Sequence, residues 1–239
     1  PIPEAVLDDA EFDIMGEITP RVNEAIGQCV DSATIFGYNR PAEWQSDIIT
    51  LARQAGNNVA DTGDKDLYDK LLGEGGVFSK VEEDGYMVSG CLSALGMRAK
   101  LRGLRATDGA LIFKSDMQGS TQYALDGAPM YFPTNGSYDK NIAQLVAGDF
   151  KQAVYAIRQD ITVKILDQGV IQDPVTKEIV YNLAQQDMIA LRVVFRMGWA
   201  LPNAATRLDE NRTGCAFAYL EPATPYTAQK VTFTVKDGS

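Results

Sequence analysis

The longest alternating stretch of the chain lies at residues 188–201. Its even-numbered positions include Arg192 and Arg196. Its odd-numbered positions are apolar, namely Ile189, Leu191, Val193, Phe195, Met197, Trp199 and Leu201. A period of two predicts one β-strand with an apolar face, roughly 45 Å long at 3.3 Å per residue. We expect Trp199 in the core with its apolar companions, and the two arginines in solvent or paired with nearby carboxylates.

A second apolar pattern has helical spacing and runs from Asp13 to Gly37. Its apolar members are Ile14, Ile18, Val22, Ala25, Ile26, Cys29, Ala33 and Phe36. Gly37 stands where a C-terminal cap belongs. Pro20, preceded by Thr19, allows either a short helix followed by a longer one or a single kinked helix. We favour one long, bent helix that packs on the apolar face of the 188–201 strand.

The remaining pattern predicts short elements of both kinds and therefore an α+β fold. Residues 151–158 and 161–166 are expected to form paired strands, because Ile161, Val163 and Ile165 alternate. The other elements are expected as helices at 47–60, 65–72, 77–83 and 92–104, and strands at 86–89, 110–113, 129–132, 215–220 and 231–235.

Composition narrows the class of protein. The chain has 239 residues, enough for one large or two modest domains, and a net charge of −10 that argues against a dedicated nucleic-acid binder. No apolar run reaches the roughly 18 residues that cross a bilayer. Because it begins at Pro1 rather than methionine, we expect a processed or trimmed product.

Histidine is absent, which removes Ser-His-Asp and Cys-His catalysis and histidine-ligated zinc. Cys29, Cys91 and Cys215 are widely spaced and odd in number, so we expect buried thiols in a reducing compartment rather than disulfides. We predict no catalytic, cofactor-binding or metal-binding residue, no cofactor and no enzymatic activity.

Three clusters are candidate sites. Asp61, Asp64, Asp66 and Asp69 lack the spacing of an EF-hand and are interpreted as helix-capping carboxylates rather than calcium ligands. The glycine-rich segment 73–76 lacks a P-loop lysine and is interpreted as a turn. Arg98, Arg102 and Arg105 would share one face of the predicted 92–104 helix, either in solvent or against an acidic patch of a neighbouring copy.

Several short motifs follow one another in an order that resembles the major capsid proteins of tailed bacteriophages, which have the Hong Kong 97-like fold. The most prominent are Gly148-Asp149-Phe150, Arg158-Gln159-Asp160-Ile161 and Asn182-Leu183. The other matching residues are Glu4, Phe12-Asp13, Asp31 to Gly37, Leu125, Gly127, Pro129, Val154, Asp187-Met188, Leu191-Arg192 and Arg196.

The resemblance implies a spine helix packed on long antiparallel strands, plus an axial α/β subdomain. The peripheral domain would comprise residues 1–45 and 186–212, and the axial domain 46–185 and 213–222, with 223–239 a C-terminal extension of unclear placement. The N-terminal arm and extended loop of that family would lie outside this chain.

The implied function is a structural major head protein that self-assembles into the icosahedral shell enclosing phage DNA. Its partners would be pentamers and hexamers of its own copies, with a scaffolding segment, maturation protease and portal; it would bind neither a membrane nor a specific nucleic-acid sequence. It would reside in the virion, and in the host cytoplasm during assembly. The alternatives are an encapsulin-like bacterial nanocompartment shell and, from another class, a histidine-free enzyme acting through the carboxylates at 61–69.

Overall fold

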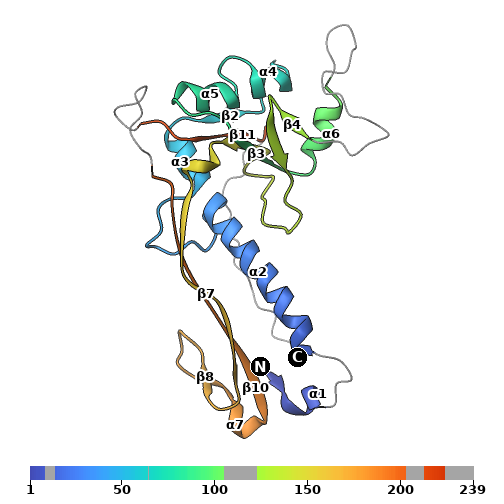
Figure 1. The fold of residues 1–239 in the computed structure, drawn as a ribbon, viewed down its shortest axis with the longest axis vertical. Helices are drawn as coiled ribbons and strands as arrows, with labels where there is room; N and C mark the ends of the chain where they lie inside the picture. The colour runs from blue at the N-terminus through green and yellow to red at the C-terminus, as the bar shows by residue number, and fades with distance from the viewer. Residues whose placement is uncertain (9–13, 64, 105–122, 203–212, 224–239) are drawn as a thin grey trace. The chain divides into compact units, whose positions relative to one another are not determined.

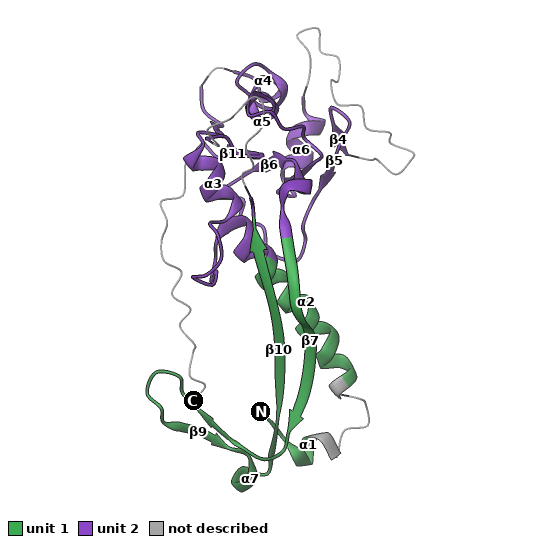
Figure 2. Ribbon diagram, turned by 60° about the vertical axis from the view of Figure 1, so that its left-hand side comes forward, with its two compact units in different colours: residues 1–30, 155–200 green, residues 31–154, 201–239 purple. Residues whose placement is uncertain are grey.

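The computed structural model describes residues 1–8, 14–63, 65–104, 123–202 and 213–223 of an α+β chain (Figure 1). The chain divides into two compact units (Figure 2). Unit 1 comprises Pro1–Val30 and Tyr155–Ala200, and unit 2 comprises Asp31–Val154 and Leu201–Ser239. These units group residues 155–185 with the long strand at 188–200, whereas the family resemblance predicts a boundary between peripheral and axial domains at residue 186.

Unit 1 is built on two strands of 13 residues each, β7 (Val154–Leu166) and β10 (Met188–Ala200). β10 confirms the strand predicted from alternation at 188–201. In contrast, the predicted pair of strands at 151–158 and 161–166 is wrong, because β7 is continuous and lies beside β10 in the sheet. No glycine, proline or asparagine stands at Gln159–Asp160 to make a turn, so the chain stays extended there.

The third strand of this sheet is β1 (Ile2–Pro3), a short edge strand in the order β1-β10-β7. It runs antiparallel to β10, with Ile2 opposite Ile189 and Pro3 opposite Met188. The backbone N–H of Glu4, the first residue of α1 (Glu4–Asp8), donates to the carbonyl of Asp187 at 3.0 Å in the same register.

Between β7 and β10 the chain forms a two-stranded antiparallel sheet and one helical turn. The strands are β8 (Val170–Gln172) and β9 (Ile179–Asn182), and the turn is α7 (Leu183–Gln186). Leu183 is 1% exposed, so it anchors this turn. Asp187 closes α7 in the left-handed conformation, with φ of 53°, and leads directly into β10. The Asn182-Leu183 and Asp187-Met188 motifs therefore mark the entry and the exit of this turn.

The helix α2 (Ile14–Phe36) is continuous over 23 residues with Pro20 inside it, as the sequence favoured. Its length is about 34 Å at 1.5 Å per residue. In its first part every fourth residue is half-buried, and the residues between them from Gly16 to Cys29 are exposed; the half-buried residues are Ile14, Ile18, Val22, Ile26 and Val30. Cys29 lies off this stripe and is exposed, so the prediction that all three thiols are buried is wrong for Cys29.

Gly37 ends α2 with φ of +74°, as expected for a C-terminal cap. A Cβ at this position would lie 2.6 Å from the carboxylate Oδ1 of Asp47. Asp47 is itself the N-cap of α3 (Ile48–Gln54) and accepts a hydrogen bond from the backbone N–H of Thr50 at 2.9 Å. The glycine thus allows the end of one helix to approach the start of the next.

Unit 2 contains a six-stranded mixed sheet in the order β2-β11-β6-β3-β5-β4. Its strands are β2 (Asn58–Ala60), β3 (Gly90–Ser93), β4 (Ala124–Leu125), β5 (Ala128–Tyr131), β6 (Leu145–Gly148) and β11 (Phe217–Glu221). The central strands β6 and β11 are antiparallel, and every residue of β6 is buried. Both α3 and α5 (Val77–Glu83) contact β11, so the core lies around this strand.

Several predicted boundaries in unit 2 need correction. The helix predicted at 47–60 ends at Gln54, and its last residues form β2. The strand predicted at 86–89 is instead β3, at Gly90–Ser93, and the helix predicted at 92–104 is shortened to α6 (Met97–Arg102). The helices predicted at 65–72 and 77–83 are confirmed as α4 (Leu67–Leu72) and α5.

The two predicted strands near 129–132 and 215–220 are confirmed as β5 and β11. The strands predicted at 110–113 and 231–235 lie outside the described residues.

The Gly148-Asp149-Phe150 motif has a packing explanation. Gly148 pairs with Phe217 on β11, and a Cβ on it would lie 2.4 Å from both the Ala216 carbonyl oxygen and the Phe217 ring. Asp149 accepts a hydrogen bond from the Lys151 N–H at 3.2 Å and so begins a 3₁₀ turn. That turn places the Phe150 ring edge-on to Phe217, with centroids 5.1 Å apart.

Candidate assembly surfaces

The carboxylates predicted as one cluster serve different roles. Asp61 makes ion pairs, whereas Asp66 is the N-cap residue of α4 and Asp69 lies in its first turn. The side chain of Asp66 makes no capping hydrogen bond, and Asp64 is outside the described residues. Within the described ranges, no three His, Cys, Asp or Glu side chains are grouped to hold a metal ion. Among the described carboxylates of this cluster, Asp61 is therefore committed to ion pairs, and none belongs to a metal-binding group of three.

Asp61 is instead the centre of a polar network in unit 2. Its Oδ1 accepts a hydrogen bond from Lys70 Nζ at 3.1 Å, and its Oδ2 accepts from Lys100 Nζ and Gln144 Nε2 at 3.0 Å each. Burial alone would raise the pKa of Asp61, but the hydrogen bonds from Lys100, Lys70 and Gln144 together hold this pKa below its ordinary value. The network ties together α4, α6 and the start of β6.

Replacing Asp61 with asparagine should lower the free energy of unfolding at pH 7 by about 1–2 kcal/mol, because hydrogen bonds to a charged acceptor are lost. Because the pKa of Asp61 is lower in the folded state, its carboxylate stabilises the wild-type fold fully at pH values well above the ordinary 3.8. This stabilisation is lost as the pH falls through the folded-state pKa. Urea unfolding of both proteins at pH 7 and pH 3 measures this. If wild type and Asp61→Asn differed by the same unfolding free energy at both pH values, the charged Asp61 carboxylate would not be the stabilising group.

The predicted arginine stripe separates into two environments. The guanidinium carbon Cζ of Arg98, on α6, lies 4.6 Å from the ring centroid of Tyr123 and 5.5 Å from that of Phe132. The Nε of Arg98 is buried without a hydrogen-bond partner among the described residues. Arg102 is exposed and donates from Nε to the Arg98 carbonyl at 3.2 Å. Arg105 lies outside the described residues. Arg98 therefore packs within its own subunit rather than forming a free basic stripe.

Arg98→Ala should lower the free energy of unfolding by about 1–2 kcal/mol, since it removes two cation–π contacts and a buried aliphatic stem. Arg102→Ala is the matched control on the same helix and should change the free energy of unfolding by less than about 0.5 kcal/mol. Thermal melting of both variants tests this. Equal destabilisation by both would show that the stacking on Tyr123 and Phe132 contributes nothing.

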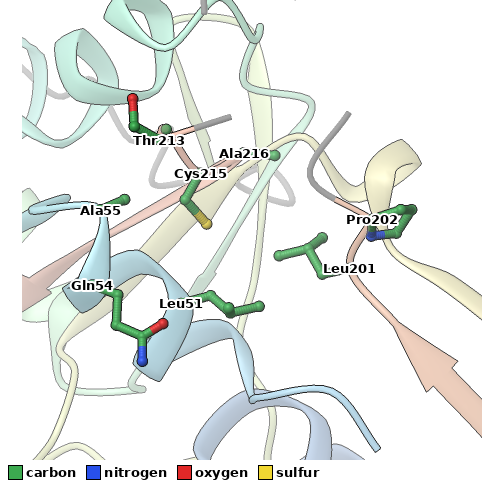
Figure 3. Close-up of a pocket in the computed structure, with 9 residues that line it drawn as sticks. Leu51, Gln54, Ala55, Leu201, Pro202, Thr213, Cys215 and Ala216 are labelled. Carbon is green, nitrogen blue, oxygen red and sulfur yellow. The ribbon is translucent and has the colours of Figure 1, made fainter. Parts of the chain in front are cut away.

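A cavity of about 230 Å³ opens in unit 2 (Figure 3). The side chains of Leu51, Leu201 and Cys215 face the same space there. Its other lining residues are Gln54, Ala55, Pro202, Thr213, Gly214 and Ala216. Burial raises the pKa of Cys215 to about 11, so its thiol is protonated and a poor nucleophile near neutral pH. No carboxylate or cationic side chain lines this space, and it lacks the groups of a catalytic site.

Unit 1 presents exposed side chains of two kinds. Four of the six odd-numbered positions of β7 form an exposed apolar row, the β7 row, of Tyr155, Ile157, Val163 and Ile165, which the half-buried Gln159 and Ile161 interrupt. Tyr155 and Ile165 are 67% and 59% exposed, which is unusual for large apolar residues in one row. Arg192 and Arg196 are exposed on β10, as predicted for its polar face, and Trp199 is buried as predicted. The alternation pattern did not reveal the β7 row, because it predicted two short strands in place of β7.

The comparisons with known proteins agree with this architecture. The sequence profile of the phage capsid family matches residues 1–206, and the chain belongs to that family. A solved structure from Microbacterium phage Oxtober96 is 32% identical, with a TM-score of 0.77, over 92% of this chain and 69% of that chain. One from Mycobacterium phage Adephagia is 30% identical, with a TM-score of 0.76, over 94% and 70%.

A more distant match shares the fold alone. The capsid of a native GTA particle is 16% identical, with a TM-score of 0.62, over 93% of this chain and 70% of that chain. No curated protein matches. The fold is thus the Hong Kong 97-like fold that the sequence motifs resembled, and the role of the chain is that of a structural capsid protein of a virion. No described helix has the length and apolar character to cross a membrane.

Proposed function

We propose that this chain is the major shell subunit of a phage head, and that its copies form the pentamers and hexamers of an icosahedral shell around the phage DNA. The observation that carries the proposal is the exposed apolar row on β7, in a chain of the phage capsid family. Such a row in a single copy is energetically unfavourable in water and becomes favourable when a neighbouring copy covers it.

The physical basis is repetition of one contact. When two different patches of identical subunits meet, the contact propagates until curvature closes the assembly. Each contact is modest, and the many contacts of one subunit make the shell stable. In this proposal a scaffolding segment, a maturation protease and a portal act with the subunit in the host cytoplasm before the shell is complete. An encapsulin-like compartment would use the same contacts but enclose protein cargo instead of DNA.

Electron microscopy of the purified chain tests the proposal, with shells, rings or tubes as the expected result. Ile157→Ser with Ile165→Ser should reduce the assembled fraction at least tenfold, because both changes lie on the β7 row. Met87→Ser is a matched control, since Met87 is 82% exposed in unit 2. A folded wild-type chain that stays monomeric at high concentration would refute the proposal, as would unchanged assembly of the double variant.

The competing enzyme hypothesis makes a different prediction. Asp66→Ala with Asp69→Ala should leave assembly intact, because neither residue belongs to the β7 row. Loss of a chemical activity with unchanged assembly would favour the enzyme.

A further inference from the structure

Unit 1 carries a cationic face on β10. Arg192 and Arg196 are four residues apart on this strand and therefore point to the same side. Both are exposed, and β10 contains no acidic residue. The neighbouring β7 adds the exposed cations Arg158 and Lys164 against a single acid, Asp160. The two-stranded body of the sheet is therefore positively charged in a protein whose net charge is −10.

The opposite charge is concentrated at the start of the chain. The first twenty residues contain six acidic residues and no basic one; the acids are Glu4, Asp8, Asp9, Glu11, Asp13 and Glu17. Glu4 lies in the first turn of α1 and Glu17 in the first turn of α2, and both are exposed. Their carboxylates are well placed for the helix dipole and remain accessible to a cation from outside.

The two charged regions are not paired within one copy as far as the described residues show. The ion pairs among these residues join Arg53 to Glu221 and Asp61 to Lys70 and Lys100, all in unit 2. Glu4 is held by its backbone beside Asp187, five residues before Arg192, and five strand residues span roughly 17 Å. Its side chain is too short to reach the arginines of its own β10.

We propose that the cationic face of β10, defined by Arg192 and Arg196, docks the acidic N-terminal segment of a second copy, through Glu4 and Glu17. This inference rests on the proposed shell function and identifies one contact that would build the shell. Charge complementarity of this kind fixes the register of two surfaces and repels wrong pairings more than it adds affinity. Because both partners are exposed, the contact weakens as salt rises.

A charge-exchange experiment tests the contact between copies. Variant S carries Arg192→Glu and Arg196→Glu, and variant H carries Glu4→Lys and Glu17→Lys. Each alone juxtaposes like charges at every contact, so its assembled fraction should fall at least tenfold by sedimentation velocity at 50 mM NaCl. In an equimolar mixture the glutamates of S meet the lysines of H, and the arginines of H meet the acids of S. Assembly should therefore return on mixing.

Three controls make the result decisive. Arg102→Glu with Lys140→Glu reverses two exposed charges in unit 2 and should assemble like wild type. Circular dichroism melting shows whether S and H are folded, and the milder Arg192→Gln with Arg196→Gln serves if S is not. The neutral variant should assemble less than wild type and respond less to raising NaCl to 500 mM.

The outcomes separate this inference from the proposed function. Folded S and H that each assemble like wild type, or that fail alone and also fail when mixed, would overturn the docking of one copy on another. Assembly of wild type that does not depend on salt would overturn it as well. A wild-type chain that never assembles would instead refute the shell function, and this inference with it.

Discussion

Gly148→Ala should lower the free energy of unfolding by about 3 kcal/mol, near the upper end of the usual cost of overpacking a core. The added methyl would overlap the Ala216 carbonyl oxygen and the Phe217 ring, each 2.4 Å from the Cβ position. Neither can move freely, because the oxygen belongs to the backbone and Phe217 is fully buried against Phe150. Urea unfolding followed by circular dichroism measures the loss.

Gly198→Ala is the matched control, because Gly198 also lies in a strand but has no atom within 4 Å of its Cβ position. It should be neutral or slightly stabilising, since alanine restricts the unfolded chain more than glycine does. If the two variants were equally stable, the close packing of β6 on β11 described above would be wrong.

Asp84→Ala should lower the free energy of unfolding by about 2–3 kcal/mol, because the Cys215 N–H loses its acceptor and Asn57 Nδ2 keeps only its longer hydrogen bonds to the carbonyls of Cys215 and Phe217. Asp84 follows α5, and its Oδ2 accepts hydrogen bonds from Asn57 Nδ2 at 2.6 Å and from the Cys215 N–H at 2.8 Å. Asn57 is 4% exposed, so water cannot readily replace the lost acceptor. The carboxylate joins α5 to the chain entering β2 and to the chain entering β11.

Asp66→Ala provides the comparison for this variant, because Asp66 also adjoins a helix but its side chain makes no capping hydrogen bond. Its unfolding free energy should stay within about 0.5 kcal/mol of wild type. Hydrogen exchange adds a second readout, since the amide of Cys215 should lose protection only in the Asp84 variant. Retained protection there would show that Asp84 does not hold the start of β11.

The sequence predicted best those elements whose pattern repeats many times. β10 was evident because its apolar residues alternate through 13 positions, and α2 because its spacing outweighed Pro20. β7 was divided because Gln159 interrupts its apolar odd-numbered positions and, with Arg158 and Asp160, makes a run of three polar residues. β3 was placed too early and its end was assigned to a helix, because a strand of four residues offers too few positions to distinguish the two periods.

Side-chain partners were hidden from the sequence for a different reason. Asp61 was grouped with acids a few residues away, but its partner Lys100 is 39 residues distant and Gln144 is 83. Arg98 was grouped with its helix neighbours, whereas its aromatic partners Tyr123 and Phe132 flank the β4–β5 hairpin. Such contacts arise from tertiary packing, which local spacing does not encode.

The register of β1 has a consequence for how the long sheet ends. The N–H of Glu4 donates to the carbonyl of Asp187. Because successive residues of a strand point to opposite sides, the N–H of Ile2 also points toward β10, and the nitrogen of Pro3 points away from it. Proline carries no hydrogen there, so the outer edge of β1 offers no amide donor to a stray strand. This margin of the sheet is thereby protected from the edge-to-edge pairing that leads to fibrous polymerisation.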